Sequence, residues 1–333
     1  MPPSLTANMK RASTAKPRQT MVTMRGHTNW VTGIAHLPGG RRIITSSYDG
    51  SLRLWNLRSG VQIGDDWRDD GDEAAVWSIA LSPNSKTVAS GSRDGKVRLW
   101  DVETKTVVAK WTGHTDAAMS LCWSVDGGRL VSGSNDGTIR VWDVESGDTV
   151  LGPIKTEHKF VSAVIYSPDT TKIATGGHSE YALKIWDAKT GDLLSTIELD
   201  STVWSLAWTS DQKKLIIGLY TSIRIFNTTT WQQIAILEGH TWPVYSLSLF
   251  QNDRLLASGS YDKTARLWNL DTNLPVGPPI QHKRALYRVA ISANGKQLVT
   301  GCSDNNAYAW DIHTTLKDAG LEELLFILDV SVK

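Results

Sequence analysis

The chain repeats one short pattern seven times, and this repetition restricts its fold more than any other feature. At intervals of about 40 to 45 residues, an apolar run ends in an aromatic residue that is followed by Asp or Asn. The seven aromatic residues are Trp55, Trp100, Trp142, Trp186, Phe226, Trp268 and Trp310. A period of this length is typical of architectures in which each repeat buries its core only against its neighbours. A blade of four short strands fits the length of one repeat.

The strands within a repeat can be placed from its apolar runs and turns. In the second repeat, runs at 76–81, 87–92, 96–100 and 106–111 are separated by polar turns. The turn at 93–95 is Arg-Asp-Gly, and Asp-Gly supplies the positive φ angles that a tight hairpin needs. The sequence therefore predicts an all-β protein, a seven-bladed β-propeller with four antiparallel strands per blade.

Four repeats also carry a His, a hydroxyl residue, an Asp and the Trp at fixed spacing. The His precedes the Asp by 22 residues, the hydroxyl residue precedes it by four, and the Trp follows it by six. The four sets are His27, Thr45, Asp49 and Trp55; His114, Ser132, Asp136 and Trp142; His240, Ser258, Asp262 and Trp268; and His282, Thr300, Asp304 and Trp310. With the Gly-His pairs at Gly26, Gly113 and Gly239, this pattern resembles the WD40-repeat family of β-propellers, and the resemblance covers residues 20–313.

The His and Asp residues also suggest a catalytic triad, but their repetition argues against one. Four complete sets at equivalent positions cannot all form a single active site. A hydrogen-bond relay from Asp to His to hydroxyl to the Trp indole explains the same residues, and it stabilises each blade by about 1 to 3 kcal/mol. Phosphate-binding glycine loops, Cys-x-x-Cys pairs and His-Glu-x-x-His motifs are absent from the sequence. We therefore expect no enzymatic activity, no cofactor and no metal.

Three repeats depart from the relay pattern. The second has Asp72 where the His is expected, and the fourth has Gly176 and Glu180 at the hydroxyl and Asp positions. The fifth loses the set together, with Ile217 at the hydroxyl position and Phe226 in place of Trp. Replacing all the polar partners by apolar groups can be nearly neutral, whereas removing one of them is costly.

The two ends of the chain predict how the ring closes. Residues 19–24 form a strand outside any repeat of their own, and the last repeat has no fourth strand after Trp310. We expect the N-terminal strand to complete the seventh blade, which removes an open sheet edge. The expected organisation is a disordered basic tail at 1–18, the propeller at 19–313, and a tail at 314–333 with a short amphipathic helix from Leu316 to Leu328.

Composition limits the classes of partner. The net charge is +1, which does not favour nucleic acid or an anionic membrane, and no apolar stretch approaches the ~18 residues of a membrane span. Cys122 and Cys302 both lie in predicted strands, which suits a reducing compartment. We expect an intracellular protein, cytoplasmic or nuclear, whose monomeric propeller binds a protein or peptide.

Partner binding is expected on the face that carries the Gly-His loops. The residue that enters each inner strand just after that loop is large in five of the seven repeats. In the propellers that this chain resembles, these residues surround the mouth of the central channel. Aromatic residues and Arg dominate binding hot spots, although packing between blades is an alternative role for several of them. The predicted partner-binding residues are Trp30, Tyr48, Trp77, Arg93, Met119, Trp204, Trp242, Tyr245, Tyr261 and Tyr287.

An acidic loop joins the first repeat to the second. Its acidic residues are Asp65, Asp66, Asp69, Asp70, Asp72 and Glu73. We expect this loop to lie at the rim of the mouth and to attract a basic peptide, a merely solvated loop being the alternative.

An alternative function depends on one basic residue. The segment 43–58 resembles the box by which WD-repeat substrate receptors dock on cullin-RING ubiquitin ligases, with Arg58 as the basic residue after Trp55-Asn56-Leu57. The rest of the box is ordinary repeat sequence. The main prediction is therefore a non-catalytic protein-interaction scaffold, and a ligase substrate receptor is the alternative.

Overall fold

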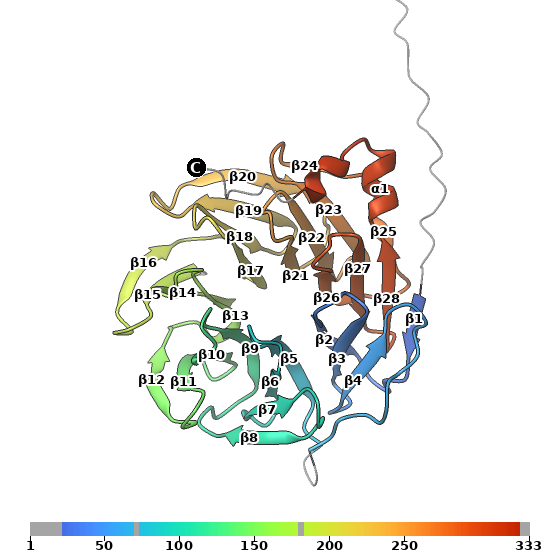
Figure 1. Ribbon diagram of the computed structural model, residues 1–333. Coiled ribbons are helices and arrows are strands. Elements are labelled where there is room, and N and C mark those ends of the chain that lie inside the picture. The colour runs from blue at the N-terminus through green and yellow to red at the C-terminus, as the bar shows by residue number, and fades with distance from the viewer. Residues whose placement is uncertain (1–21, 70–72, 179–182, 327–333) are drawn as a thin grey trace, which may run out of the picture.

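The computed structural model describes residues 22–69, 73–178 and 183–326, and they form a closed ring of seven blades (Figure 1). The prediction of an all-β, seven-bladed propeller is confirmed. Blade two shows the unit: β5 (Val76–Leu81), β6 (Thr87–Ser92), β7 (Val97–Asp101) and β8 (Val107–Trp111) pair antiparallel in chain order. The first strand of each blade lies next to the central channel, and the fourth lies at the outside of the ring.

Blades three to five repeat this order. Blade three consists of β9 (Ala118–Trp123), β10 (Arg129–Ser134), β11 (Thr138–Asp143) and β12 (Thr149–Lys155). Blade four consists of β13 (Phe160–Tyr166), β14 (Lys172–His178), β15 (Leu183–Asp187) and β16 (Leu193–Ile197). Blade five consists of β17 (Ser205–Trp208), β18 (Lys214–Gly218), β19 (Ser222–Asn227) and β20 (Gln233–Glu238).

The outer strands of blades one and six are irregular. Blade one has β2 (Val31–His36), β3 (Arg42–Ser47) and β4 (Leu52–Asn56), and its outer position is reduced to bridges from β4 to Gln62 and Trp67. Blade six has β21 (Val244–Leu249), β22 (Leu255–Ser260) and β23 (Thr264–Asn269), and β24 (Leu274–Pro275) and β25 (Ile280–Gln281) share its outer position.

The N-terminal strand closes the ring, as predicted. Blade seven contains β26 (Leu286–Ile291), β27 (Gln297–Cys302) and β28 (Asn306–Asp311), and β1 (Val22–Arg25) pairs antiparallel with β28 (Figure 1). Met24 of β1 is 1% exposed and packs in a core cluster with Val31 and Trp55 of blade one. The two ends of the ring are therefore joined by backbone hydrogen bonds and by a shared core. Residues 19–21 and the tail predicted at 1–18 lie outside the described residues.

Small residues allow the blades to approach one another closely. A Cβ atom on Gly91 of β6 would lie 2.5 Å from the carbonyl oxygen of Ala118, in the inner strand of the next blade. Since real Cβ atoms do not come this close to backbone, the recurring glycine of the second strand is required by blade packing rather than by a turn.

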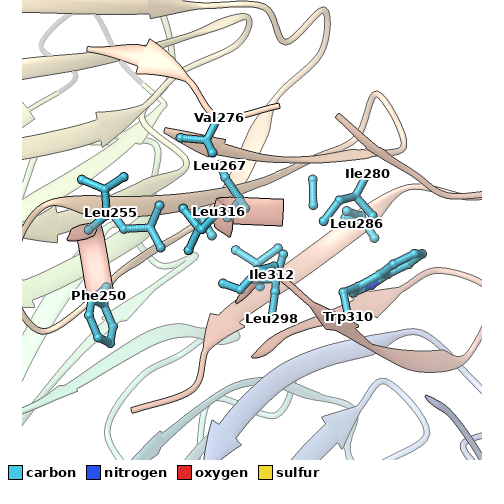
Figure 2. Packing of buried hydrophobic residues seen from close by; sticks show 14 of the residues in the cluster. Phe250, Leu255, Leu267, Val276, Ile280, Leu286, Leu298, Trp310, Ile312 and Leu316 are labelled. Atoms are coloured by element: carbon cyan, nitrogen blue, oxygen red, sulfur yellow. The ribbon is translucent and has the colours of Figure 1, made fainter. Parts of the chain in front are cut away.

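The C-terminal segment differs from the single helix expected from Leu316 to Leu328. It forms α1 (His313–Asp318) and a short 3₁₀ helix, η1 (Glu322–Leu325), which are separated by Gly320 at φ +68°. A glycine in this left-handed conformation ends an α-helix. Leu316 and Leu324 are fully buried, and Figure 2 shows Leu316 near Leu267 and Ile312. The segment therefore packs on blades six and seven, and Leu328 lies outside the described residues.

In blade one the four landmark side chains form a continuous hydrogen-bonded relay. His27 Nδ1 lies 2.9 Å from Asp49 Oδ2, His27 Nε2 lies 2.8 Å from Thr45 Oγ1, and Trp55 Nε1 donates to Thr45 Oγ1 at 2.7 Å. Because the carboxylate can only accept, we assign the imidazole proton to Nδ1, and the Thr45 hydroxyl then donates to Nε2. Blades three and six have the same relay with distances of 2.7 to 3.0 Å, in His114, Ser132, Asp136 and Trp142 and in His240, Ser258, Asp262 and Trp268.

The relay also sets the charges of its members. Burial lowers the pKa of His27 and His240, although their Asp partners oppose this shift, so both imidazoles are neutral at pH 7. Burial alone would raise the pKa of Asp262, but hydrogen bonds, mainly from His240, lower it to about 2. In blades one and six the relay is thus a carboxylate that holds a neutral imidazole in one tautomer.

In blade four the relay hydroxyl comes from Thr175, one residue before Gly176, where the sequence spacing places it. Thr175 Oγ1 accepts from Trp186 Nε1 at 2.9 Å and lies 3.3 Å from His158 Nε2. Thr175 pairs across the hairpin with Lys184, two residues before Trp186, as Thr45 pairs with Arg53, two residues before Trp55. A hairpin one residue longer therefore shifts the sequence spacing but preserves the register. Glu180 lies outside the described residues.

In blade seven the prediction that His282 joins the relay is wrong. Trp310 Nε1 donates to Thr300 Oγ1 at 3.0 Å, but the Tyr308 hydroxyl, rather than His282, donates to Asp304 at 2.5 Å. Among the residues that the structure describes, none accepts from or donates to the buried Nε2 of His282. Tyr308 occupies the cross-strand position opposite Thr300, where six other blades have Arg or Lys. Burial lowers the pKa of His282 to about 4.

Blades two and five depart from the relay in different ways. In blade two Trp100 Nε1 still donates to Ser90 Oγ at 2.8 Å, and Arg98 donates to Asp94 at 2.8 Å. In blade five the apolar residues Ile217 and Phe226 replace the hydroxyl residue and the Trp of the relay. They are 0% and 3% exposed and belong to one core cluster. Asp72 lies outside the described residues.

Candidate functional site

The propeller brings one residue from the entry of each of its seven inner strands to one opening. They line a pocket of about 210 Å³ together with Phe160 and Arg288. The seven residues are Thr32, Trp77, Met119, Ser162, Trp204, Tyr245 and Tyr287. Since radial repetition places equivalent residues around one axis, the pocket is the mouth of the central channel. We call this set the channel mouth.

Aromatic rings from blades one, two and seven form one half of the rim. Trp30 stacks on Tyr287 with ring centroids 5.3 Å apart, and it contacts Tyr48 at 5.6 Å. Tyr48 meets the edge of Trp77 at 5.1 Å, and Arg93 Nη1 donates to the Tyr48 hydroxyl at 3.0 Å. Ring contacts of this kind hold the side chains in place before a ligand arrives, which reduces the entropy lost on binding.

Rings from blades five and six continue the arc. Tyr245 stacks on Tyr287 at 5.4 Å and meets the edges of Trp204 at 5.0 Å and Tyr261 at 6.0 Å. Trp242 contacts Tyr261 at 5.9 Å and is 48% exposed. The predicted aromatic residues therefore form one connected surface, and its outermost rings remain open to a partner.

One residue of the mouth was missed by sequence reasoning. Arg288 directly follows Tyr287 in the inner strand of blade seven. At the equivalent pairing position the other six blades have Gly, Ser or Ala: Gly33, Ser78, Ser120, Ala163, Ser205 and Ser246. An alignment of the residue after the mouth residue across the seven repeats shows Arg only in the seventh.

Two acidic residues of the loop that was expected at the rim, Asp66 and Asp69, are paired with basic side chains of this chain. Asp69 is 8% exposed and accepts from Arg98 Nε at 2.8 Å, and Lys110 Nζ lies 2.5 Å from its other oxygen. Burial alone would raise the pKa of Asp69, but these two cations lower it. Asp66 pairs with Arg68 at 2.8 Å. Asp65 and Glu73 are exposed, whereas Asp70 and Asp72 lie outside the described residues.

Arg58, the residue on which ligase docking depends, is exposed in the turn after β4. Its backbone N–H donates to Asn56 Oδ1 at 2.9 Å. Within the described ranges there is no group of three or more His, Cys, Asp or Glu side chains placed to hold a metal ion. The helices of the same ranges include none with the length and apolar character needed to cross a membrane.

Comparison with known proteins identifies the family. The family model described as "WD domain, G-beta repeat" matches residues 18–56, 68–101, 105–143, 151–187, 231–269 and 277–311. The chain belongs to the WD40-repeat family. The one blade without a match is blade five, which lacks the His, the hydroxyl and the Trp of the relay.

Several curated proteins are similar to part of the chain. Protein FIZZY-RELATED 2 of Arabidopsis thaliana is 31% identical over 169 residues, which cover 49% of this chain and 35% of the relative. APC/C activator protein CDH1 of Saccharomyces cerevisiae is 33% identical over 132 residues, covering 37% and 23%. "Cell division cycle 20.1, cofactor of APC complex" of Arabidopsis thaliana is 27% identical over 260 residues, covering 75% and 56%.

These matches span about a quarter to just over half of each relative's length. The family and these relatives support the prediction of a non-catalytic protein-interaction scaffold. They do not favour the cullin-RING alternative, because two of the three relatives are named for the APC complex.

Proposed function

We propose that this propeller is a monomeric adaptor that binds a protein ligand at its channel mouth. The connected arc of aromatic rings carries the proposal, because it joins five blades and leaves Trp30 and Trp242 38% and 48% exposed. Rings that are held in place and partly exposed are typical of binding hot spots. Of the described residues of the acidic loop, Asp65 and Glu73 support a basic partner, whereas Asp66 and Asp69 are paired within the chain.

The relatives indicate which assembly to test first. Proteins named as activators or cofactors of the APC complex match up to 75% of this chain, so we propose a protein of that machinery as ligand or as host assembly. The same names support an intracellular setting, and we propose the nucleus or the cytoplasm.

Affinity purification with two exposed rim variants tests the proposal. Trp30→Ala and Trp242→Ala each remove a partly exposed ring, so the fold should be retained. Truncation of a hot-spot residue costs about 2 kcal/mol or more, which corresponds to roughly 30-fold weaker binding. We expect both variants to lose the APC-complex protein that the wild-type chain retains.

The matched control is Val125→Ser. Val125 is 68% exposed in the turn at the opposite end of the inner strand from Met119, and it lines a separate pocket with Trp123 and Trp208. This variant should retain the partner. Equal recovery of the partner with both rim variants would show that the channel mouth is not the binding site.

A further inference from the structure

Arg288 lies in the channel just inside the mouth. It lines the mouth pocket and also the pocket below it, which measures about 250 Å³ and is surrounded by the inner strands. The other blades have only Gly, Ser or Ala at this position, so the guanidinium occupies space that small side chains leave open. Its Nη1 donates to the backbone carbonyl oxygens of Tyr245 at 3.2 Å and Tyr287 at 3.3 Å.

The guanidinium has no carboxylate partner in the described part of the chain. Across residues 22–69, 73–178 and 183–326, neither pocket is lined by an Asp or Glu, and the ion pairs do not include Arg288. Burial lowers the pKa of Arg288 to about 10, so the side chain is still charged at neutral pH. A partly buried cation without an anion is costly, and here the open channel gives a ligand access to it.

A donor without an acceptor lies in the same place. Trp204 Nε1 is buried, and the described residues offer it no hydrogen-bond partner. Trp204 and Arg288 both line the mouth pocket and the channel pocket, and Tyr245 lies between them, in contact with the Trp204 ring. Arg288, which no carboxylate of the described residues pairs, and Trp204, whose indole N–H has no acceptor there, therefore line one space from blades seven and five. An ionised oxygen ligand is the group that can accept from both side chains.

We propose that this space is an anion subsite of the channel mouth, which takes the Asp or Glu side chain of an extended segment of the protein ligand. The carboxylate accepts from the Arg288 guanidinium and from Trp204 Nε1–H, and the rings of Tyr245 and Tyr287 pack against the aliphatic part. This inference rests on the proposed use of the mouth as a ligand site. It also reverses the charge expected of the segment that reaches the channel, which was basic in the sequence analysis.

Titration with small probes tests the subsite without a recovered partner. The probe is N-acetyl-glutamate N-methylamide, the neutral isostere is N-acetyl-glutamine N-methylamide, and the readout is the indole N–H resonance of Trp204, assigned by its loss in Trp204→Phe. We expect a saturable shift with the glutamate probe at fixed ionic strength, and none with the glutamine probe. Inorganic phosphate forms a separate arm: a shift with phosphate but none with glutamate would overturn the assignment to a carboxylate.

A variant of Arg288 and a matched control at a second Arg complete the test. Arg288→Ser introduces the residue that four other blades carry at this position, so it should fold, and it should abolish the shift. Arg41→Ser removes an exposed Arg from the turn between β2 and β3 and should leave the shift unchanged. An equal shift with the glutamine probe, or a full shift in Arg288→Ser, would overturn the subsite.

A recovered partner separates this inference from the proposed function. We expect Arg288→Ser to weaken its binding about 10-fold or more, since hydrogen bonds to charged groups contribute about 1.5 to 3 kcal/mol. A partner that loses affinity in Trp242→Ala but binds Arg288→Ser at full strength would overturn the anion subsite and leave the proposed function intact. A partner indifferent to Trp242→Ala would refute the proposed function, while the probe titration would still decide the subsite.

Discussion

The relay hydroxyl can be removed from two blades by the same substitution with different consequences. Thr45 Oγ1 is bonded to both His27 Nε2 at 2.8 Å and Trp55 Nε1 at 2.7 Å. Thr300 Oγ1 is bonded to Trp310 Nε1 at 3.0 Å, and His282 makes no bond to it. Because Val has nearly the shape of Thr, neither Thr45→Val nor Thr300→Val leaves a cavity. The two variants differ in how many buried polar groups they leave without a partner.

The expected magnitudes follow from that difference. A buried donor or acceptor left unpaired costs about 1 to 3 kcal/mol. Thr300→Val leaves the Trp310 indole unpaired and removes a long bond, of 3.4 Å, from the Thr300 hydroxyl to the Tyr308 carbonyl oxygen. Thr45→Val leaves two buried side-chain groups unpaired, the Trp55 indole N–H and the lone pair of His27 Nε2. We therefore expect Thr45→Val to lower the free energy of unfolding by about 1 to 3 kcal/mol more than Thr300→Val does.

Equilibrium unfolding in urea measures this difference from the midpoints, provided that the slopes are unchanged. A double-mutant cycle adds a second readout: in a Trp55→Phe background, the cost of Thr45→Val should fall by about 1 kcal/mol or more, because the indole N–H is already gone. Equal costs for Thr45→Val and Thr300→Val would refute the reasoning that the number of unpaired groups determines the cost.

Three further predictions concern the ring and its irregular blades. Deleting residues 1–25 removes β1 with the buried Met24 and should lower the free energy of unfolding by about 3 kcal/mol or more, as measured in urea; an unchanged midpoint would contradict closure by β1. The folded pKa of His282 is about 4, below the usual 6.5, so the stability that its neutral form contributes is full above pH 6.5 and is lost as the pH falls toward 4. His282→Phe should therefore reduce the fall of the urea midpoint between pH 7 and pH 4. The matched variant His240→Phe removes a hydrogen-bonded histidine and should lower the midpoint already at pH 7. Phe226→Trp should lower the melting temperature because Ile217 offers the new indole no acceptor, and adding Ile217→Thr should recover part of the loss; a rise with Phe226→Trp alone would contradict this account of blade five.

The architecture could be predicted because it depends on periodic features. Blade number, strand order and ring closure follow from the repeat length and from the unpaired strand at the N-terminus. The mouth residues could be predicted for the same reason, since the entry of each inner strand recurs at one position of the repeat. In blade four the hydroxyl was misplaced because spacing was counted along the chain, whereas the cross-strand pairing of Thr175 with Lys184 determines which hydroxyl meets the Trp.

The errors arise where a residue outside the motif competes for a partner. By spacing alone, His282 and Asp304 are indistinguishable from the pairs in blades one, three and six. Tyr308 changes the outcome, because it reaches the same carboxylate from the neighbouring strand. The ion pairs of Asp69 could not be predicted for the same reason, since the cations that pair with it come from β7 and β8, about 30 to 40 residues further along the chain. Contacts of this kind depend on tertiary packing, and no motif in one repeat encodes them.

Because the seven blades are copies of one unit, each serves as a reference for the others. Where a blade departs from the pattern on a surface that faces its neighbours, the chain largely compensates: blade five replaces the whole relay with apolar groups, and blade two pairs Asp94 with Arg98. Arg288 is a departure that faces the channel, and no carboxylate of the described residues lines its pockets. Four other blades have Ser at this position, and Ser builds the same ring without the cost of desolvating a cation. The unpaired charge of Arg288 on the channel surface is therefore better explained by a ligand than by the stability of the ring.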